Sequence, residues 1–392
     1  MSDGQVLFLV LCLLYLSDCF FWIRRGTAAF VSPWGARWRA AGGTRLFGND
    51  RGYPLFLNPL PPLDRVVLAH LAPVSISPRG VRAGTRQTLP GAEGGKRTAE
   101  ALPFERIAKA RADGPWLRID GAKFARCGSP AQAREVAELI GRAAAVPENK
   151  REPLIRHWVA GRYSGKNAAA ALAGADDAAR PPRRMAVAFF VFLFAVAPAA
   201  AVVVGLVPTF YPLAALTVAF AVAMAVAFGF GHRSVFPGEG GDRAAHVAKM
   251  VLCPPAAIRA ADALTAEAAS SFSPLVVACE LSADDHRAFA ATFLRDLKHP
   301  LADDPADALA AEVATWYLDL ERRQATKYVE KRHPRLLEEA FAPPAPEPGS
   351  ASYCPRCRAQ SADDAAQCPD CEGVALVPFA GGKAAGKGKA DG

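Results

Sequence analysis

Apolar residues are concentrated in three long stretches of the chain. The first runs from Val6 to Ile23, the second from Met185 to Val207 and the third from Phe210 to Phe230. A helix needs roughly 20 mainly apolar residues to cross a hydrocarbon core about 30 Å thick, because each residue adds about 1.5 Å. All three stretches reach this length. The pattern predicts three transmembrane helices: an anchor over residues 5–24 and a helical hairpin over residues 185–231.

The flanks of the first stretch favour a retained anchor over a signal peptide. Residues 1–5 contain no basic side chain, and the stretch closes on bulky aromatic residues at 20–22 instead of a small-residue cleavage site. Arginines follow the first stretch and precede the second, as at Arg24 and Arg184, and such basic flanks stay in the cytoplasm. We therefore expect an integral membrane protein with its N-terminus outside and its C-terminus cytoplasmic, in the inner membrane if the source is bacterial.

The composition of the hairpin limits what the membrane part can do. Between Met185 and Gly231 there is no Asp, Glu, Lys, Arg or His, whereas proton relays and ion pathways place ionisable side chains inside the bundle. This disfavours a pump or a coupled transporter. We expect a tight turn at Pro208-Thr209 and a kink at Pro198, because proline removes a helical hydrogen bond.

Small residues recur at every fourth position in both hairpin stretches, at Ala197, Ala201 and Gly205 and again at Ala221, Ala225 and Gly229. Such rows allow two helices to approach closely. The abundance of alanine in this part of the chain is a second explanation.

Charge is distributed unevenly between the two polar regions. Residues 24–184 carry 28 Lys and Arg against 13 Asp and Glu, whereas the chain after residue 231 carries 18 against 23. A basic region beside the cytoplasmic leaflet is attracted to anionic lipid, by about 1 kcal/mol for each base near the surface. Contact with anionic lipid is the simplest explanation of the imbalance. Nucleic acid is the competing partner, but no recognition helix or aromatic strand motif accompanies the bases.

The basic region, residues 45–164, begins with strand-like runs at Tyr53–Leu57, Arg65–Leu71 and Val74–Ser77. The glycine-rich segment from Gly80 to Lys96 is expected to be a loop. Asp120-Gly121 lies between two alternating runs, a pattern that predicts a tight β-hairpin.

Two helices are expected to complete this region. Ser129-Pro130 has the residues of a helix start, and an apolar stripe follows at Val136, Leu139 and Ile140. A second helix is expected from Pro153 to Tyr163. The Ala/Asp/Pro-rich residues 165–184 are expected to form a linker to the hairpin.

This order of strands, hairpin and terminal helix, with the run Ile119-Asp120-Gly121, resembles the bacterial pleckstrin-homology-like domains over residues 53–145. The resemblance implies a binding or assembly module. A fold of this kind specifies neither the ligand nor the partner.

The second polar region, residues 242–341, has helical patterns at about 242–252, 255–270, 282–298 and 305–331. Ser282-Ala283-Asp284-Asp285 has the form of a capping box with Asp in place of Glu, and an apolar face follows at Phe289, Phe293 and Leu297. Residues 274–278 fit either a buried strand or a helix start.

Histidine and most cysteine residues stand alone in the sequence. His246, His286, His299 and His333 show no paired ligand spacing, and neither a Gly-x-Ser-x-Gly motif nor a phosphate-binding loop is present. The isolated cysteines are Cys12, Cys19, Cys127, Cys253 and Cys279. We expect ordinary packing or surface roles for them, and we assign no catalytic residue.

Two cysteine pairs near the C-terminus form the most specific motif of the chain. Cys354 and Cys357, then Cys368 and Cys371, are each separated by two residues, and ten residues lie between the pairs. Zinc prefers four tetrahedral ligands, and a Cys-x-x-Cys turn directs two thiolates at one ion. The spacing therefore predicts one structural Zn²⁺ site, which the reducing cytoplasm would keep unoxidised.

These Cys-Pro-x-Cys pairs look like those of the short bacterial zinc-ribbon family over residues 353–379. The resemblance implies the same four cysteines as ligands. Arg358 and Glu372 stand where that family often has glycine, which leaves the turn geometry open. Pro-rich residues 342–352 are expected to link the ribbon to the helices, and residues 380–392 are expected to be a disordered tail.

The sequence thus predicts a multidomain α+β membrane protein with three transmembrane helices, a small β-rich domain ending in a helix, a helical cytoplasmic region and a C-terminal zinc ribbon. A closed four-cysteine site has no open position for substrate, which favours folding or docking over catalysis. We expect a non-enzymatic membrane-anchored scaffold or adaptor that meets a protein partner through the ribbon. A nucleic-acid- or ribosome-associated membrane protein, and an enzyme or metal/redox sensor with an unrecognised site, are the alternatives.

Overall fold

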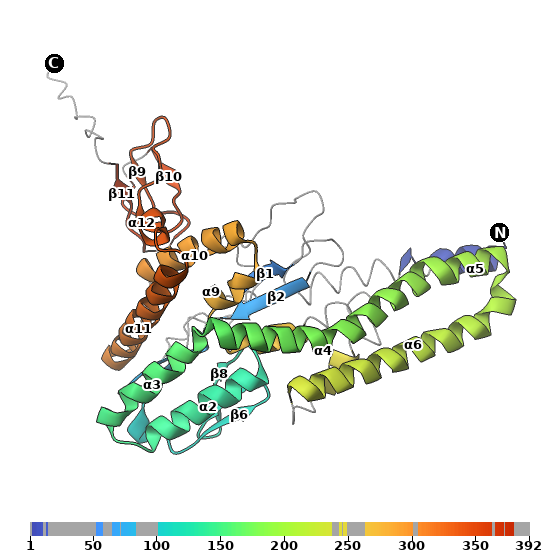
Figure 1. The fold of residues 1–392 in the computed structure, drawn as a ribbon, viewed down its shortest axis with the longest axis horizontal. Coiled ribbons are helices and arrows are strands. Elements are labelled where there is room, and N and C mark those ends of the chain that lie inside the picture. Colours follow the sequence, from blue (N-terminus) through green and yellow to red (C-terminus); the bar gives the residue numbers. More distant parts are fainter. Residues whose placement is uncertain are drawn as a thin grey trace.

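The computed structural model describes residues 2–10, 13–14, 52–57, 65–70, 72–83, 101–236, 243–244, 246–248, 263–300, 305–362, 365–371 and 373–379. These residues form a mostly helical molecule with small antiparallel sheets, in agreement with the expected mixed class. A long helical hairpin extends from one side of a globular body, and the small C-terminal sheet stands at another end (Figure 1).

Two described helical segments are long and apolar enough to cross a membrane, Gly165–Val203 and Leu206–Val235. The first consists of α4 (Gly165–Val191), a π-helical turn (Phe192–Val196) and α5 (Ala197–Val203), and the second is α6 (Leu206–Val235). Of the expected anchor, residues 3–10 and 13–14 are helical, and the rest of 5–24 lies outside the described residues.

The turn of the hairpin lies at Val204 and Gly205, so the expected turn at Pro208-Thr209 is wrong. Gly205 has φ of 105°, a conformation that glycine adopts far more easily than any other residue. Pro208 lies in the first turn of α6, where a missing N–H costs nothing. Pro198 is the second residue of α5, and the π-helical turn just before α5 interrupts the regular α-helix close to this proline.

Residues 165–184, expected as a linker, form most of α4 instead. Ser164 caps this helix, because its Oγ accepts a hydrogen bond from the backbone N–H of Asn167 at 3.4 Å. The alanines that suggested a linker are the strongest helix formers. Four positions of α4 at helical spacing are buried: Ala168, Leu172, Ala175 and Ala179.

The β-rich part contains three small antiparallel sheets. β1 (Gly52–Leu57) pairs with β2 (Arg65–His70). β3 (Val74–Ser77), β4 (Gly80–Ala83) and β5 (Ala101–Pro103) form the second sheet, and β6 (Ala110–Asp113), β7 (Trp116–Ile119) and β8 (Ala122–Arg126) form the third. The expected loop from Gly80 therefore begins with a strand, and residues 84–96 lie outside the described residues.

The hairpin and helix start predicted in this region are confirmed. Asp120 and Gly121 both have positive φ, 48° and 85°, as a tight turn between β7 and β8 requires. Helix α2 (Pro130–Ala144) begins where Ser129 Oγ accepts from the backbone N–H of Gln132 at 3.0 Å. The predicted stripe on α2 is completely buried. Helix α3 (Glu148–Arg162) follows.

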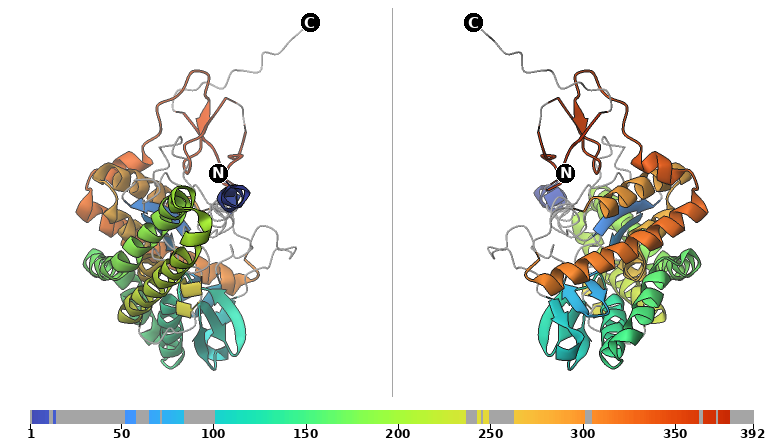
Figure 2. Two further views of the ribbon diagram at one scale, coloured as in Figure 1. Left: turned by 90° about the vertical axis from the view of Figure 1, so that its right-hand side faces the viewer. Right: turned by 90° about the vertical axis from the view of Figure 1, so that its left-hand side faces the viewer.

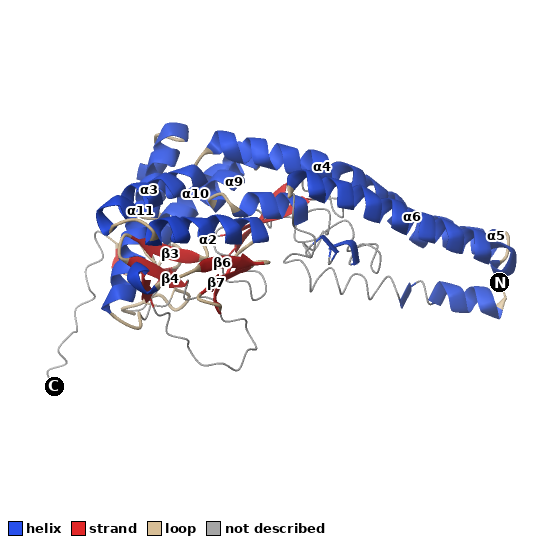
Figure 3. Ribbon diagram, turned by 90° about the horizontal axis from the view of Figure 1, so that it is seen from below, coloured by secondary structure: helices blue, strands red, loops and turns tan. Residues whose placement is uncertain are grey.

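Helices of the second polar region pack against the β-rich part (Figure 3). They are α9 (Pro274–Val277), α10 (Ala283–Lys298), α11 (Ala308–Arg332) and α12 (Leu336–Phe341), and residues 263–270 are also helical. Residues 274–278 thus form a helix start. Ser282 caps α10 through the N–H of Asp285, as expected, and the predicted apolar face of α10 is buried.

One continuous core joins the two regions that the sequence presents as separate. Val74 and Ile76 of β3 belong to the same buried cluster as Phe293 of α10 and Val329 of α11. Helix α11 lies directly against β3 and β4. The short strands cannot bury their apolar faces alone, and the later helices cover them.

The C-terminal sheet contains β9 (Ser352–Tyr353) between β10 (Gln360–Ser361) and β11 (Val377–Pro378). The rings of Tyr353 and Phe379 lie 5.1 Å apart beside it. This sheet projects from the helical body in both end-on views (Figure 2).

Candidate metal centre

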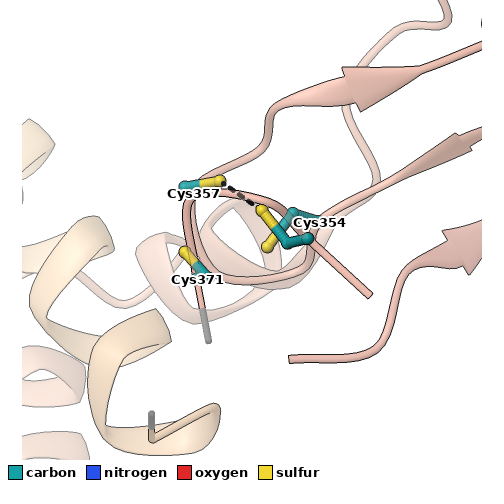
Figure 4. Close-up of side chains that lie close together, drawn as sticks. Cys354, Cys357 and Cys371 are labelled. Atoms are coloured by element: carbon teal, nitrogen blue, oxygen red, sulfur yellow. Dashed lines mark hydrogen bonds between the residues drawn. The ribbon is translucent and has the colours of Figure 1, made fainter. Parts of the chain in front are cut away.

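Cys354, Cys357, Cys368 and Cys371 come together in one cluster, as the spacing predicted. Their Sγ atoms all lie within 4.8 Å of one another, and Cys357 Sγ and Cys368 Sγ are 3.6 Å apart. Four thiolates about 2.3 Å from a tetrahedral ion stand about 3.8 Å apart, so the cluster has the dimensions of a four-thiolate site. Figure 4 shows the labelled thiols of Cys354, Cys357 and Cys371 gathered at the turns.

Backbone hydrogen bonds hold both cysteine turns in shape. In the first turn the N–H of Arg358 donates to Cys354 O at 2.9 Å, and the N–H of Cys354 donates to Ala359 O at 2.8 Å. In the second turn the N–H of Cys368 donates to Val374 O at 2.9 Å. Cys354, Cys368 and Cys371 are buried and Cys357 is exposed. Within the described residues, this is the one group of His, Cys, Asp and Glu side chains that converges closely enough to hold a metal ion.

Arg358 and Glu372 stand after the two cysteine pairs, where the zinc-ribbon family often has glycine. Arg358 adopts φ of 66°, so the first turn needs the left-handed conformation although it has no glycine there. In the second turn Gly373 takes that conformation, with φ of 75°, one position after Glu372. The first turn therefore carries backbone strain that a glycine would remove.

The surroundings of the cluster shift the pKa values of three of its thiols. Although Cys357 is exposed as a residue, partial desolvation of its thiol raises its pKa to about 11, and the neighbouring Cys354 and Cys368 thiols add to the rise. Burial also raises the pKa of Cys371. Burial acts against ionisation of Cys354 as well, but backbone N–H groups of Cys357 and Arg356 hold its pKa below the ordinary value. Several thiolates this close together repel one another, and a positive ion between them would stabilise them.

A nearly buried ion pair docks the first cysteine turn on α10. Arg356, inside the turn, pairs with Asp296 at 3.0 Å, and the two side chains are 11% and 13% exposed. Arg356 also donates to His299 O at 2.7 Å, and Arg295 Nε donates to Arg356 O at 3.1 Å. The ribbon is therefore fastened to the helical core by side chains as well as by the Pro-rich segment. Sequence reasoning missed this contact, because no spacing connects residues so far apart in the chain.

Two histidines that stand alone in the sequence form a pair. His286 Nε2 lies 3.2 Å from Leu275 O, which can only accept, so Nε2 carries the proton and Nδ1 accepts from His333 Nε2 at 2.9 Å. Burial lowers the pKa of His286 to about 4, and burial lowers that of His333 too. The pair connects α9, α10 and the end of α11 as neutral imidazoles.

A second histidine cluster lies at the base of the α4–α6 hairpin. Each oxygen of the Glu267 carboxylate faces a different imidazole: Oε1 is 3.0 Å from His246 Nε2, and Oε2 is 3.6 Å from His232 Nε2. His232 is completely buried at the end of α6. These contacts tie the hairpin to the helix over residues 263–270. His299, by contrast, contributes its carbonyl oxygen to the docked turn.

Two cysteines that stand alone in the sequence lie apart from the four-cysteine cluster. Cys127 is buried in the core and Cys279 is half-buried.

Helix α6 exposes most of its apolar surface. Only 11% of its most apolar part is buried, and large apolar residues such as Val207 and Phe230 are exposed along it. An apolar surface of this extent on a folded protein indicates contact with lipid or protein.

No protein-family model matches the chain, and neither a curated protein nor a solved structure matches it.

Proposed function

We propose that this chain is a non-enzymatic, membrane-anchored scaffold whose hairpin α4–α6 crosses the bilayer and whose four cysteines hold a structural Zn²⁺ ion. The observation that carries the proposal is the closed four-cysteine cluster fastened to the helical core by Arg356 and Asp296. A site with four protein ligands leaves no position for a substrate or an activated water. Its role is to fold a small recognition element and to hold it in a fixed orientation.

The exposed apolar surface of the hairpin supports the membrane assignment. The N-terminal helix begins beside the hairpin tip, where Gln5 Nε2 donates to Ala201 O at 2.8 Å (Figure 1). In lipid such an amide needs a partner of this kind, since unpaired polar groups are costly there. This contact is compatible with an N-terminus and a hairpin tip on the same, outer side. The body and the ribbon would then lie in the cytoplasm, with the basic region near anionic lipid.

Metal analysis of the purified full chain tests the zinc assignment. We expect one equivalent of Zn²⁺ per chain, lost in the Cys354→Ser/Cys357→Ser variant. The matched control is Cys279→Ser, a half-buried cysteine outside the cluster, which should keep the full equivalent. A purified protein that holds another metal, or that takes up no Zn²⁺ when reduced, would contradict the assignment.

Affinity purification from detergent-solubilised membranes tests the scaffold role. The same variant, the control and the wild type are compared for co-purifying proteins. We expect the variant to lose at least one protein that the control keeps, because loss of the metal unfolds the ribbon. Identical partner sets for all three proteins would reject docking through the ribbon.

A further inference from the structure

A shallow groove of about 540 Å³ lies between strand β6 and helix α2. Residues 110–112 of β6 form one wall, and the stripe of α2 at Arg134, Ala137, Glu138, Gly141 and Arg142 forms the other. These positions of α2 follow the helical spacing that places side chains on one face. The groove therefore lies beside β6 and follows one face of α2.

Strand β6 is an edge strand within the described part of the chain, because β7 pairs with it on one side and no described strand pairs on the other. The N–H of Asp120 donates to Lys109 O at 2.8 Å. In the antiparallel register with β7, backbone groups of alternate residues point toward the partner strand. Those of Ala110 and Ala112 therefore point away from β7, toward the open edge of the sheet.

The groove has small residues where a second chain would need room. Ala110 and Ala112 supply methyl groups from β6, and Ala137 and Gly141 face them from α2. A Cβ atom built on Gly141 would meet nothing within 4 Å. The groove therefore has open space beside Gly141.

The charges on the walls indicate the kind of chain that fits. Two arginines of α2, Arg134 and Arg142, line the groove against one acid, Glu138, whereas the side chain of Arg111 alternates to the other face of β6. Basic walls favour an acidic ligand. The outward backbone groups of β6 are satisfied by a peptide main chain, whereas a lipid headgroup has no N–H groups in a strand repeat.

We propose that this groove binds an extended acidic segment of a partner protein, which adds to the β6–β7–β8 sheet as a further strand beside β6. The proposal deepens the scaffold role, on which it rests, by giving the β-rich part a partner class and a site of its own. It places this contact away from the metal centre, so the two can be tested separately.

Selection from a displayed library of random ten-residue peptides tests the proposal on the purified full chain in detergent. We expect wild type to enrich acidic peptides with β-forming residues at alternate positions. Gly141→Leu fills the groove and should abolish this enrichment. The matched control is Gly161→Leu on α3, a helical glycine whose added Cβ also meets nothing within 4 Å. It should enrich the same peptides as wild type.

Binding of the best selected peptide is then measured by fluorescence anisotropy. We expect at least a tenfold loss of affinity for Arg142→Glu, and a similar loss when alternate backbone nitrogens of the peptide carry methyl groups, because methylation removes the strand hydrogen bonds. Vesicles containing phosphatidylglycerol should not compete. Enrichment without acidic residues, equal selection by Gly141→Leu, unchanged binding of the methylated peptide or displacement by the vesicles would each overturn the proposal. Loss of ribbon partners in the cysteine variant would leave this result unaffected.

Discussion

Arg356 connects the four-cysteine cluster to the helical core. Its guanidinium reaches both the Asp296 carboxylate and the His299 carbonyl from inside the first cysteine turn. A charge left without its partner in such a place is costly, by roughly 3 kcal/mol or more. The orientation of the ribbon on α10 therefore depends on this side chain.

We predict that Asp296→Asn releases the ribbon while the metal stays bound. Hydrogen exchange at residues 342–362 should accelerate by at least tenfold, because the docked state loses on the order of 2 kcal/mol or more. Zn²⁺ content should stay at the wild-type level. The exposed pair Arg287 and Glu339 offers a control: Glu339→Gln should leave exchange in the ribbon nearly unchanged, since exposed pairs contribute little. Unchanged exchange in Asp296→Asn would contradict the docking role.

His286 makes the free energy of unfolding depend on pH. Its pKa is lowered from an ordinary 6.5 to about 4 by burial, so the unfolded chain binds more protons than the folded chain between those values. The free energy of unfolding should therefore fall as the pH drops from about 6.5 to 4, by on the order of 3 kcal/mol in full. His333 adds a change of the same sign.

Thermal unfolding of the detergent-solubilised protein measures this effect. The Tm should be lower near pH 5 than near pH 7.5, and His286→Gln, which does not titrate, should show a smaller difference between the two conditions. An equal pH difference in wild type and variant would show that other groups cause it.

At the level of single residues, the features that depend on nearby positions in the chain could be predicted from the sequence. The four cysteines, the Ser129 and Ser282 caps and the Asp120-Gly121 turn each depend on neighbours a few positions away. Arg356 with Asp296, and His286 with His333, could not be found in this way. Their partners lie on other elements, and nothing in a single sequence fixes which elements meet.

At the level of elements, the packing of α4 against α6 uses residues other than the expected rows. Ala197 and Ala201 are buried as expected, but the buried positions of α6 are Met224, Phe228 and His232 instead of Ala221, Ala225 and Gly229. The large side chains of α6 lie in the same buried cluster as Ala175, Ala179 and Ala186 of α4. Small residues on one helix accommodate large ones on the other.

Gly231 is the position where the two helices approach most tightly among the described glycines. A Cβ atom there would lie 2.6 Å from Ala178 O, which is backbone and cannot move aside. We predict that Gly231→Ala pushes the helices apart and lowers the Tm of the solubilised protein by several degrees. Gly229→Ala is the matched control, since its Cβ would meet nothing within 4 Å. A Tm for Gly231→Ala equal to that of the control would contradict this packing.

Helices and strands whose apolar positions recur at a clear spacing could be predicted from the sequence. Helix α4 shows why other elements could not. Composition made residues 165–184 resemble a connector, because Ala, Asp and Pro dominate there. Yet the buried positions at 168, 172, 175 and 179 follow a helical spacing. Alanine is ambiguous between a core position and a surface position, so its periodicity is hard to see before the packing partner is known.

At the level of the whole molecule, the two polar regions on either side of the hairpin share one core. β3 lies against α11, although the hairpin separates them in the chain. Both regions must therefore be on the same side of any membrane that the hairpin crosses. The even number of crossings between them satisfies this requirement, and the four-cysteine cluster then lies on that side too.

Protease protection of terminal tags on intact cells tests this account most directly. One tag precedes Ser2 and the other follows Gly392, each with the same cleavage site. We predict that protease added outside removes the N-terminal tag and leaves the C-terminal tag intact until the membrane is permeabilised. Cleavage of the C-terminal tag on intact cells would place the ribbon outside and contradict the account of a cytoplasmic scaffold anchored by the hairpin.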